Sequence, residues 1–181
     1  MKTIIKKKTT ISEKDNLIIL TNKISNLSDF NLSDSEISHI KKEIKDEKEI
    51  ITINQYSRIV TIVSPKKEKD NNQYSENIRL LGDKLLSTFS SEKSVLIIDV
   101  DNNPNNTLLL AEGLALSNYT FTKHKTEPKA NKLETIYMCK NSNKSDLNEL
   151  QNIIDSVYLT RDLVNEPFSH LTAVNLSNEA K

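Results

Sequence analysis

The residue types that most often carry chemistry are scarce in this sequence, and they lie far apart. Only two glycines occur, Gly82 and Gly113, and both fall within helical patterns. A phosphate-binding loop needs glycines because its backbone adopts positive φ angles and approaches the anion closely. Neither G-x-G-x-x-G nor G-x-x-x-x-G-K-[ST] can be assembled here, so we do not expect nucleotide binding through such a loop.

Histidines are the next candidates, since they serve as general bases and metal ligands. His39, His124 and His170 are widely separated, and none belongs to an H-E-x-x-H or C-x-x-C…H pattern. The sequence therefore does not predict a structural zinc site. We interpret His39, on the polar side of its helix, as solvated. We interpret His124 as a surface or interface residue rather than a catalytic one.

Two acids allow both a functional and a structural interpretation. Asp99 and Asp101 end the apolar run at 94–100, where active-site residues of α/β proteins commonly lie and where paired acids could hold a metal. The same acids with Asn102 and Asn103 also make a turn that leads into a helix, and we favour the turn. The sequence thus yields no catalytic, cofactor-binding or metal-ligating residue.

The elements that must position these residues follow an α/β pattern. Apolar runs at 16–20 and 94–100 predict strands, and the second is apolar on both faces and hence central. The β-rich runs at 49–55 and 57–65 are so close that only an antiparallel hairpin can join them. A further strand is predicted at 133–139.

Helical periods separate these strands. Ser33 and Glu36 are spaced as a capping box at the start of one helix, whose isoleucines recur at helical spacing. Residues 71–90 predict an amphipathic helix that covers the sheet. We expect the first ten residues to be loosely ordered, because nothing obvious holds the lysines at 6–8.

Two further helices follow. Asn103 and Pro104 have the types preferred at the cap and the first position of a helix. The helix after them is apolar nearly all round, so it must be buried on more than one side. The last long helix, at about 144–166, is ended by Pro167. We expect its apolar stripe to consist of Leu147, Leu150, Ile154, Val157 and Val164.

Composition limits the classes of function. The 25 basic and 25 acidic residues balance, so no long-range field attracts nucleic acid or an anionic membrane, and nucleic-acid binding is disfavoured. The longest apolar runs are far shorter than the roughly 20 residues of a spanning helix, and the lysine-bearing N-terminus lacks the apolar region of a secretory signal. The single cysteine, Cys139, predicts a buried structural thiol and a reducing compartment. We therefore expect a soluble, cytoplasmic protein without a membrane partner.

Two segments carry a resemblance to a known family. "SVYLTRDLVNEPFSHLTAVNLSNEAK" (156–181) resembles the junction of the cytosol (leucyl) aminopeptidases, where a pattern like A-R-D-L-V-N-x-P-x-N-x-L-T-P leads into the catalytic domain. "LAEGLALSNYTFTKHKT" (110–126) is similar to that family's E-G-x-x-L-x-x-Y-x-F-x-x-Y-K segment. The matching residues are Arg161, Asp162, Leu163, Val164, Asn165, Pro167, Leu171 and Thr172 in the first segment, and Glu112, Gly113, Leu116, Tyr119, Phe121 and Lys125 in the second.

The resemblance implies an N-terminal α/β domain with a macro-domain-like fold, in which helices flank a mixed, mostly parallel sheet. A long linker helix would join it to a catalytic domain that carries two divalent metals, Zn or Mn, and releases N-terminal amino acids from peptides. The family's metal-binding segments look like G-K-G-x-x-[FY]-D-[ST]-G-G and N-T-D-A-E-G-R-L, and neither occurs in this sequence. No ligand can be carried over. Phe168-Ser169-His170 also departs from the family's junction, where a small or Asn-bearing sequence is usual.

The expected organisation is a non-catalytic N-terminal domain at 1–166, including the linker helix, followed by a truncated start of the catalytic domain at 167–181. Val174 and Leu176 would then belong to a helix with nothing left in the sequence to pack against. The expected role is assembly and active-site access, with its own catalytic domain and a homo-oligomer, a hexamer, as partners. A stand-alone macro-like ligand-binding module and a nucleic-acid-binding accessory domain remain as alternatives.

Overall fold

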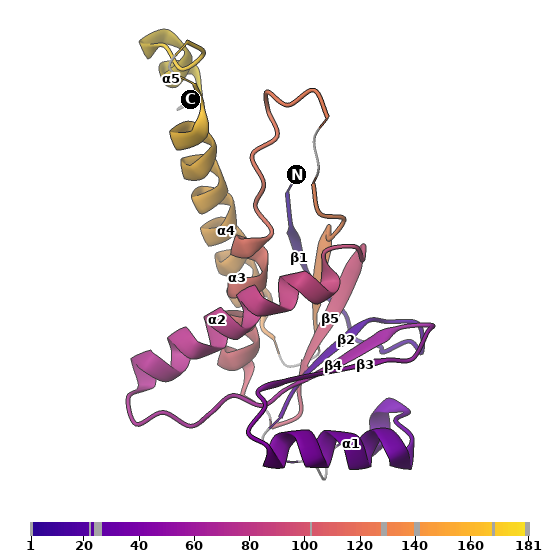
Figure 1. The fold of residues 1–181 in the computed structure, drawn as a ribbon. Helices are drawn as coiled ribbons and strands as arrows, with labels where there is room; N and C mark the ends of the chain where they lie inside the picture. Colours follow the sequence, from indigo (N-terminus) through magenta and orange to yellow (C-terminus); the bar gives the residue numbers. More distant parts are fainter. Residues whose placement is uncertain are drawn as a thin grey trace.

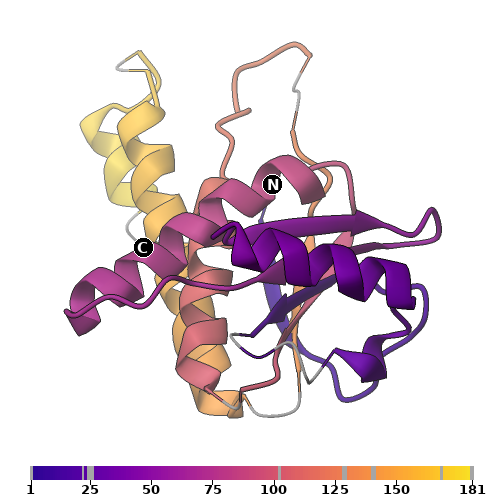
Figure 2. The same cartoon turned by 60° about the horizontal axis from the view of Figure 1, so that its bottom comes forward.

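The structure, a computed structural model, describes residues 2–21, 23, 27–101, 103–127, 130–139, 142–167 and 169–179. A six-stranded sheet has helices on both faces (Figures 1 and 2). The elements are β1 (Ile4–Lys7), β2 (Leu17–Leu20), the short 3-10 helix η2 (Ser28–Phe30), α1 (Asp34–Lys45), β3 (Ile50–Asn54), β4 (Ile59–Val63), α2 (Asn71–Phe89), β5 (Ser94–Asp99), α3 (Pro104–Ser117), β6 (Thr135–Met138), α4 (Lys144–Asn165) and α5 (Ala173–Glu179).

The strand order is β1-β6-β5-β2-β4-β3. Every neighbouring pair is parallel except β3 and β4, which form the predicted antiparallel hairpin with Thr52 opposite Thr61. The sheet is therefore mixed and mostly parallel, as predicted. The strands β5 and β2 occupy its centre, which explains why their sequences are apolar on both faces.

The alternation of side chains along β2 divides the interior into two cores. Ile18 and Leu20 face α2, α3 and α4, where the larger core lies. Leu17 and Ile19 face the other side, where α1 and η2 cover the sheet with Ile40 as the central contact. Figure 2 shows α1 across one face of the sheet. All four residues of β2 are buried. A shift of its pairing by one residue would exchange the side chains that face the two cores, so this burial fixes the register of the strand.

The two glycines allow α2 and α3 to pack unusually close together. A Cβ atom added at Gly113 would lie 2.0 Å from the carbonyl oxygen of Arg79, and one added at Gly82 would lie 2.4 Å from that of Leu110. Both glycines are helical, as predicted, and both lie at this contact between α2 and α3. The chain of α3 is buried against α2, α4 and β5, which confirms that it is covered on more than one side.

The two predicted helix starts differ in their capping. At α1 the hydroxyl of Ser33 accepts from the backbone N–H of Glu36, and the Glu36 carboxylate accepts from the N–H of Ser33 at 2.7 Å, so the capping box is confirmed. At α3 Asn103 occupies the cap position before Pro104, but its side chain makes no capping hydrogen bond. Its ψ angle is 89°, whereas Ser33 has the extended value of 160° that suits capping.

The expectation of a loosely ordered N-terminus is wrong. The strand β1 pairs in parallel with β6 and forms an edge of the sheet. Ile5 is buried, and its backbone N–H donates to Gln151 of α4 at 2.8 Å. The lysines are held as well, because Lys7 donates to the carbonyl of Ser142 and Lys8 pairs with Asp15 at 2.6 Å.

The linker helix α4 contributes buried side chains to the core only as far as Tyr158. Its buried residues are Leu147, Leu150, Ile154 and Tyr158. The first three confirm the predicted stripe, whereas Val157 is half-buried and Tyr158 is buried in place of Val164. Val164 is 79% exposed, because α4 runs beyond the sheet and its last turns leave the core (Figure 1). Among the described residues, no helix combines the length and the apolar character that crossing a membrane requires.

Candidate functional site

The acids at the end of β5 form a turn. The backbone N–H of Asp101 donates to Oδ1 of Asp99 at 2.7 Å, and Thr21 donates to Oδ1 of Asp101 at 3.5 Å. Such a local bond from backbone to side chain is the usual role of Asp in a turn. The predicted turn at Asp99 and Asp101 is therefore present, although Asn103 makes no capping hydrogen bond and Asn102 lies outside the described residues.

Neither His39 nor Cys139 belongs to a cluster of metal-ligating side chains within the part of the chain that the structure describes. His39 is exposed on α1, as expected. Cys139 lies directly after β6 and is half-buried rather than fully buried, since it packs only at the rim of the core beneath α1. Neither residue is gathered into a site.

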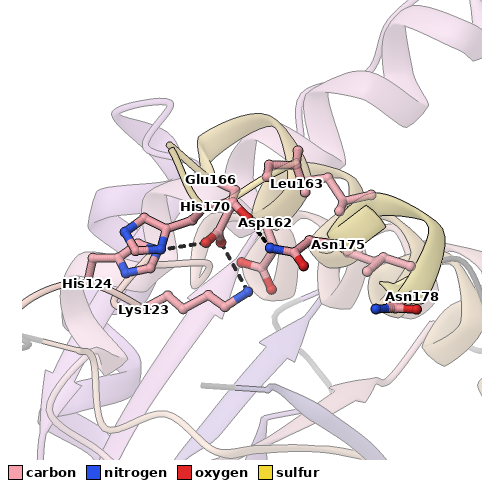
Figure 3. A pocket seen from close by; sticks show the side chains of 10 residues that line it. Lys123, His124, Asp162, Leu163, Glu166, His170, Asn175 and Asn178 are labelled. Carbon is pink, nitrogen blue, oxygen red and sulfur yellow. Dashed lines mark hydrogen bonds and ion pairs between the residues drawn. The ribbon is translucent and has the colours of Figure 1, made fainter. Parts of the chain in front are cut away.

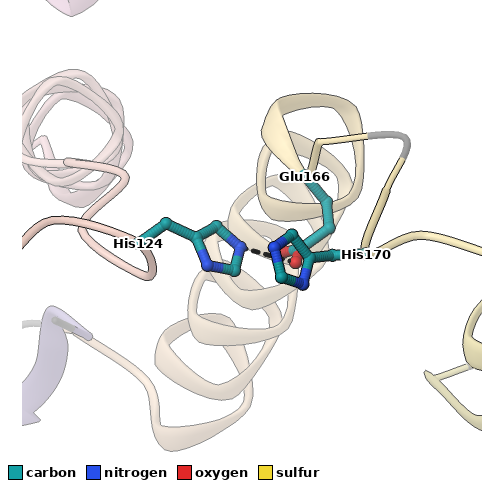
Figure 4. A group of neighbouring side chains, drawn as sticks. All are labelled: His124, Glu166 and His170. Atoms are coloured by element: carbon teal, nitrogen blue, oxygen red, sulfur yellow. Dashed lines mark hydrogen bonds and ion pairs between the residues drawn. The ribbon is translucent and has the colours of Figure 1, made fainter.

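Three side chains that are distant in sequence meet beyond the end of α4 (Figure 4). One ligand atom each from His124, Glu166 and His170 lies within 4.8 Å of the others, and over the described residues this is the one such group of histidine, cysteine or acidic side chains. Nε2 of His124 lies 2.7 Å from Oε1 of Glu166. The two imidazole rings stack, with centroids 4.4 Å apart and planes inclined by 21°.

Each member of this cluster comes from a different segment. Glu166 caps the C-terminus of α4, where its N–H donates to the carbonyl of Asp162 at 3.0 Å. Pro167 ends the helix, and its carbonyl accepts from the N–H of His170 at 2.8 Å in the tight turn before α5. His124 lies in the long connection after α3, with its ring 5.9 Å from that of Phe121. A turn induced by proline thus folds His170 back onto the helix end.

The carboxylate at the centre of the cluster is charged. The side chain of Glu166 is 6% exposed, and Nζ of Lys123 lies 3.0 Å from its Oε2. Burial raises the pKa of Glu166, but the hydrogen bonds from His124 and Lys123 outweigh burial and bring the pKa below its usual value. The group therefore remains an anion at neutral pH, balanced by Lys123 and by the donor on His124.

A hollow of about 370 Å³ opens beside this carboxylate (Figure 3). Its walls come from the connection after α3, the last turns of α4, and α5. The lining residues are Lys123, His124, Leu159, Asp162, Leu163, Glu166, His170, Leu171, Asn175 and Asn178. The arrangement offers imidazole nitrogens, carboxylates and amides around one small space, which suits a cation or a small polar ligand.

The two segments that carry the family resemblance meet next to this hollow. Tyr119 donates its hydroxyl to Asp162 at 2.8 Å, and the guanidinium of Arg161 lies 5.5 Å from the centroid of the Tyr119 ring. Arg161 also donates to the carbonyl of Leu116 at the end of α3. These contacts fix α4 against the exit of α3, so Leu116, Tyr119, Arg161 and Asp162 among the matching residues hold the two helices together.

No metal ligand was predicted from the sequence, and neither was this cluster. His124 and Glu166 are 42 residues apart, which matches no ligand-spacing motif. The available signal was the departure of Phe168-Ser169-His170 from the family's junction, which placed a histidine just after the helix end. The family's metal-binding segments, as the resemblance gives them, contain a lysine and acids but no histidine. This cluster of two imidazoles and one carboxylate therefore does not fit the family's two-metal chemistry.

The chain is similar to aminopeptidases both in part of its sequence and in its fold. No protein-family model matches the chain. A probable cytosol aminopeptidase of Clostridium tetani (strain Massachusetts / E88) is 35% identical over 78 residues, which is 40% of this chain and 16% of that protein. Among solved structures, a tomato leucine aminopeptidase mutant matches with a TM-score of 0.66 at 14% identity, over 99% of this chain and 41% of that one.

Two other solved structures agree with this fold. The bottromycin maturation enzyme BotP in complex with Mn matches with a TM-score of 0.63 at 12% identity, over 91% of this chain and 35% of that one. Leucine aminopeptidase of Caenorhabditis elegans matches with a TM-score of 0.56 at 16% identity, over 99% of this chain and 39% of that one. The chain therefore spans about two-fifths of the enzymes whose fold it shares. It is similar in sequence to a cytosol aminopeptidase over 78 residues, and its fold is that of the corresponding part of the leucine aminopeptidases.

Proposed function

We propose that this chain is the non-catalytic N-terminal domain of a dimetal leucyl aminopeptidase, and that it serves assembly and access to the active site. The observation that carries the proposal is the coverage: the fold matches over 99% of this chain but only 41% of the tomato enzyme. The segments that would bind the family's metals do not occur in this sequence. A domain of this kind contributes by holding and shielding a catalytic partner.

The surface of the linker helix supports a partner of that kind. Beyond the core, Leu159 and Val164 of α4 and Val174 and Leu176 of α5 are exposed apolar side chains. Exposed apolar side chains at the end of a domain can mark a surface that another domain covers. We assign the occupant as the catalytic domain, because α4 is the element that leads away from the sheet (Figure 1).

The contacts of α4 with the rest of the domain would hold the helix in a fixed direction. The helix is held at its start by Leu147 and Leu150 in the core and further along by Arg161 and Tyr119 at the end of α3. A helix fixed at two points well apart keeps its direction. The catalytic partner would then sit at a defined place relative to the sheet.

Peptidase assays test the proposal. Hydrolysis of leucyl-p-nitroanilide by this chain, with Mn²⁺ or Zn²⁺ present, should be undetectable. A fusion of this domain to the catalytic region of the Clostridium tetani relative should be active. Metal-dependent turnover by the chain alone, retained through purification, would refute the non-catalytic assignment.

Substitutions on α4 test the proposed contact. In the fusion, Leu159→Asp with Val164→Asp should place two charges in the covered surface and lower both activity and the assembled mass in light scattering. Asn152→Asp adds a charge at an exposed position of the same helix and should leave both unchanged. Equal behaviour of the two fusions would show that neither Leu159 nor Val164 contacts the partner.

A further inference from the structure

We propose that His124, Glu166 and His170 bind one divalent transition-metal ion, with Zn²⁺ the best match, at the point where α4 ends. Two imidazoles and a carboxylate are a donor set that Zn²⁺ uses when three protein groups bind it and a fourth position stays open. The inference rests on this cluster alone and does not depend on the proposed aminopeptidase role.

The distances are close to those that a metal site needs. Ligands 2.0–2.2 Å from a tetrahedral Zn²⁺ lie about 3.3 Å from one another. Here the three ligand atoms lie within 4.8 Å of one another. Figure 4 shows both rings meeting at the carboxylate end of Glu166. Rotation of the three side chains would be needed to bring the ligand atoms from this spacing to that of a bound ion.

The charge around Glu166 also suits a cation. A carboxylate that is 6% exposed requires a positive partner, and Lys123 and the donor on His124 now provide it. An ion bound by Glu166 would take over that role. Lys123 can leave without cost in burial, since its side chain is already 53% exposed. The lysine and the metal therefore compete for the same carboxylate.

The hollow beside the cluster supplies the open position. Asp162 and Asn175 line it next to Glu166 (Figure 3), and the space of about 370 Å³ admits water or a further polar ligand. Asn175 also donates to the carbonyl of His170 at 2.6 Å, which holds the turn that carries this histidine.

An ion at this place would join three segments: the connection after α3, the end of α4 and the turn before α5. Each segment contributes one ligand, from His124, Glu166 and His170. The ion would thereby fix the direction in which the chain leaves the linker helix. Its role would be to make the junction rigid.

Metal titration of the whole chain tests the site. After removal of metals with EDTA, we expect Zn²⁺ to bind in calorimetry with one ion per chain and to raise the melting temperature. Co²⁺ should give the visible absorption of a tetrahedral site. His124→Gln and His170→Gln should each weaken binding at least roughly tenfold, judged against the 10–100-fold that even outer groups contribute.

Two variants separate this site from adventitious binding. His39→Gln removes the exposed histidine of α1 and should leave the affinity unchanged. Lys123→Met should tighten binding several-fold, because it removes the competing cation. Circular dichroism confirms that each variant is folded. Absence of uptake by the unsubstituted chain, or affinity insensitive to both His124→Gln and His170→Gln, would overturn the proposal.

Discussion

Replacement of Gly113 by alanine tests how α2 and α3 are packed. The added Cβ atom would lie 2.0 Å from the carbonyl oxygen of Arg79, while ordinary contacts begin at 3.4 Å. The obstacle is backbone, which cannot rotate away as a side chain can. The two helices would therefore have to separate by about 1.4 Å at this point.

The cost can be worked from that separation. A helix contact of roughly 100 Å² opened by about 1.4 Å leaves roughly 140 Å³ of void, which at about 24 cal/mol per Å³ costs about 3 kcal/mol. Alanine in a helix interior is favoured over glycine by about 1 kcal/mol. We expect Gly113→Ala to lower the free energy of unfolding by about 2 kcal/mol, the reverse of its effect in an exposed helix.

Urea unfolding followed by circular dichroism measures this change. With an m-value of about 2 kcal/mol per M, the midpoint should fall by about 1 M. Asn105→Ala, at an exposed position of α3, should change the free energy of unfolding by less than about 0.5 kcal/mol. A Gly113→Ala protein as stable as the unsubstituted chain would mean that α2 and α3 are not in this close contact.

Two further substitutions probe local interactions. The N–H of Ser33 donates a hydrogen bond to the Glu36 carboxylate and lowers the pKa of Glu36. The ionised carboxylate therefore stabilises the folded protein above the unfolded pKa of about 4.3. This stabilisation is lost as the pH falls through the lower pKa of the folded state. Glu36→Gln should therefore lower the melting temperature at pH 7 and flatten its decline below about pH 4.3; an unchanged acid limb would contradict this. Tyr158→Phe removes the hydroxyl that donates to the buried carbonyl of Ala115. This should lower the free energy of unfolding, measured in urea, by about 1–3 kcal/mol. A loss below about 0.5 kcal/mol would show that the carbonyl finds another donor.

Local periodicity was sufficient to predict most of the sheet and its helices. The hairpin of β3 and β4 followed from two β-rich runs with almost no residues between them, and the central place of β5 followed from its apolar faces. The strand β1 was missed because its four residues end in two lysines and its partner β6 lies at the far end of the domain. An edge strand of this length is held by contacts such as Ile5 with Gln151, which no local pattern contains.

The candidate site could not be predicted for a related reason. Ligand motifs are recognisable when one helix or one turn sets the spacing, as in two histidines four residues apart. Here the spacing is set by the length of α4 and by the path of the connection after α3. Only the folded chain brings His124 onto Glu166, and only the turn at Pro167 adds His170. The unusual histidine at the junction, His170, was the one local sign of this cluster.

The residues that carry the family resemblance have a mechanical role in this fold. Glu112 accepts from Arg79 of α2 at 3.0 Å, and Gly113 admits the backbone of the same Arg79. Tyr119 and Arg161 then fasten α4 to the exit of α3. Together these contacts set the angle between α2, α3 and α4. The proposed function, in which this domain holds a catalytic partner in one place, would depend on that angle. The resemblance can therefore be strong in a chain whose sequence lacks the family's metal-binding segments.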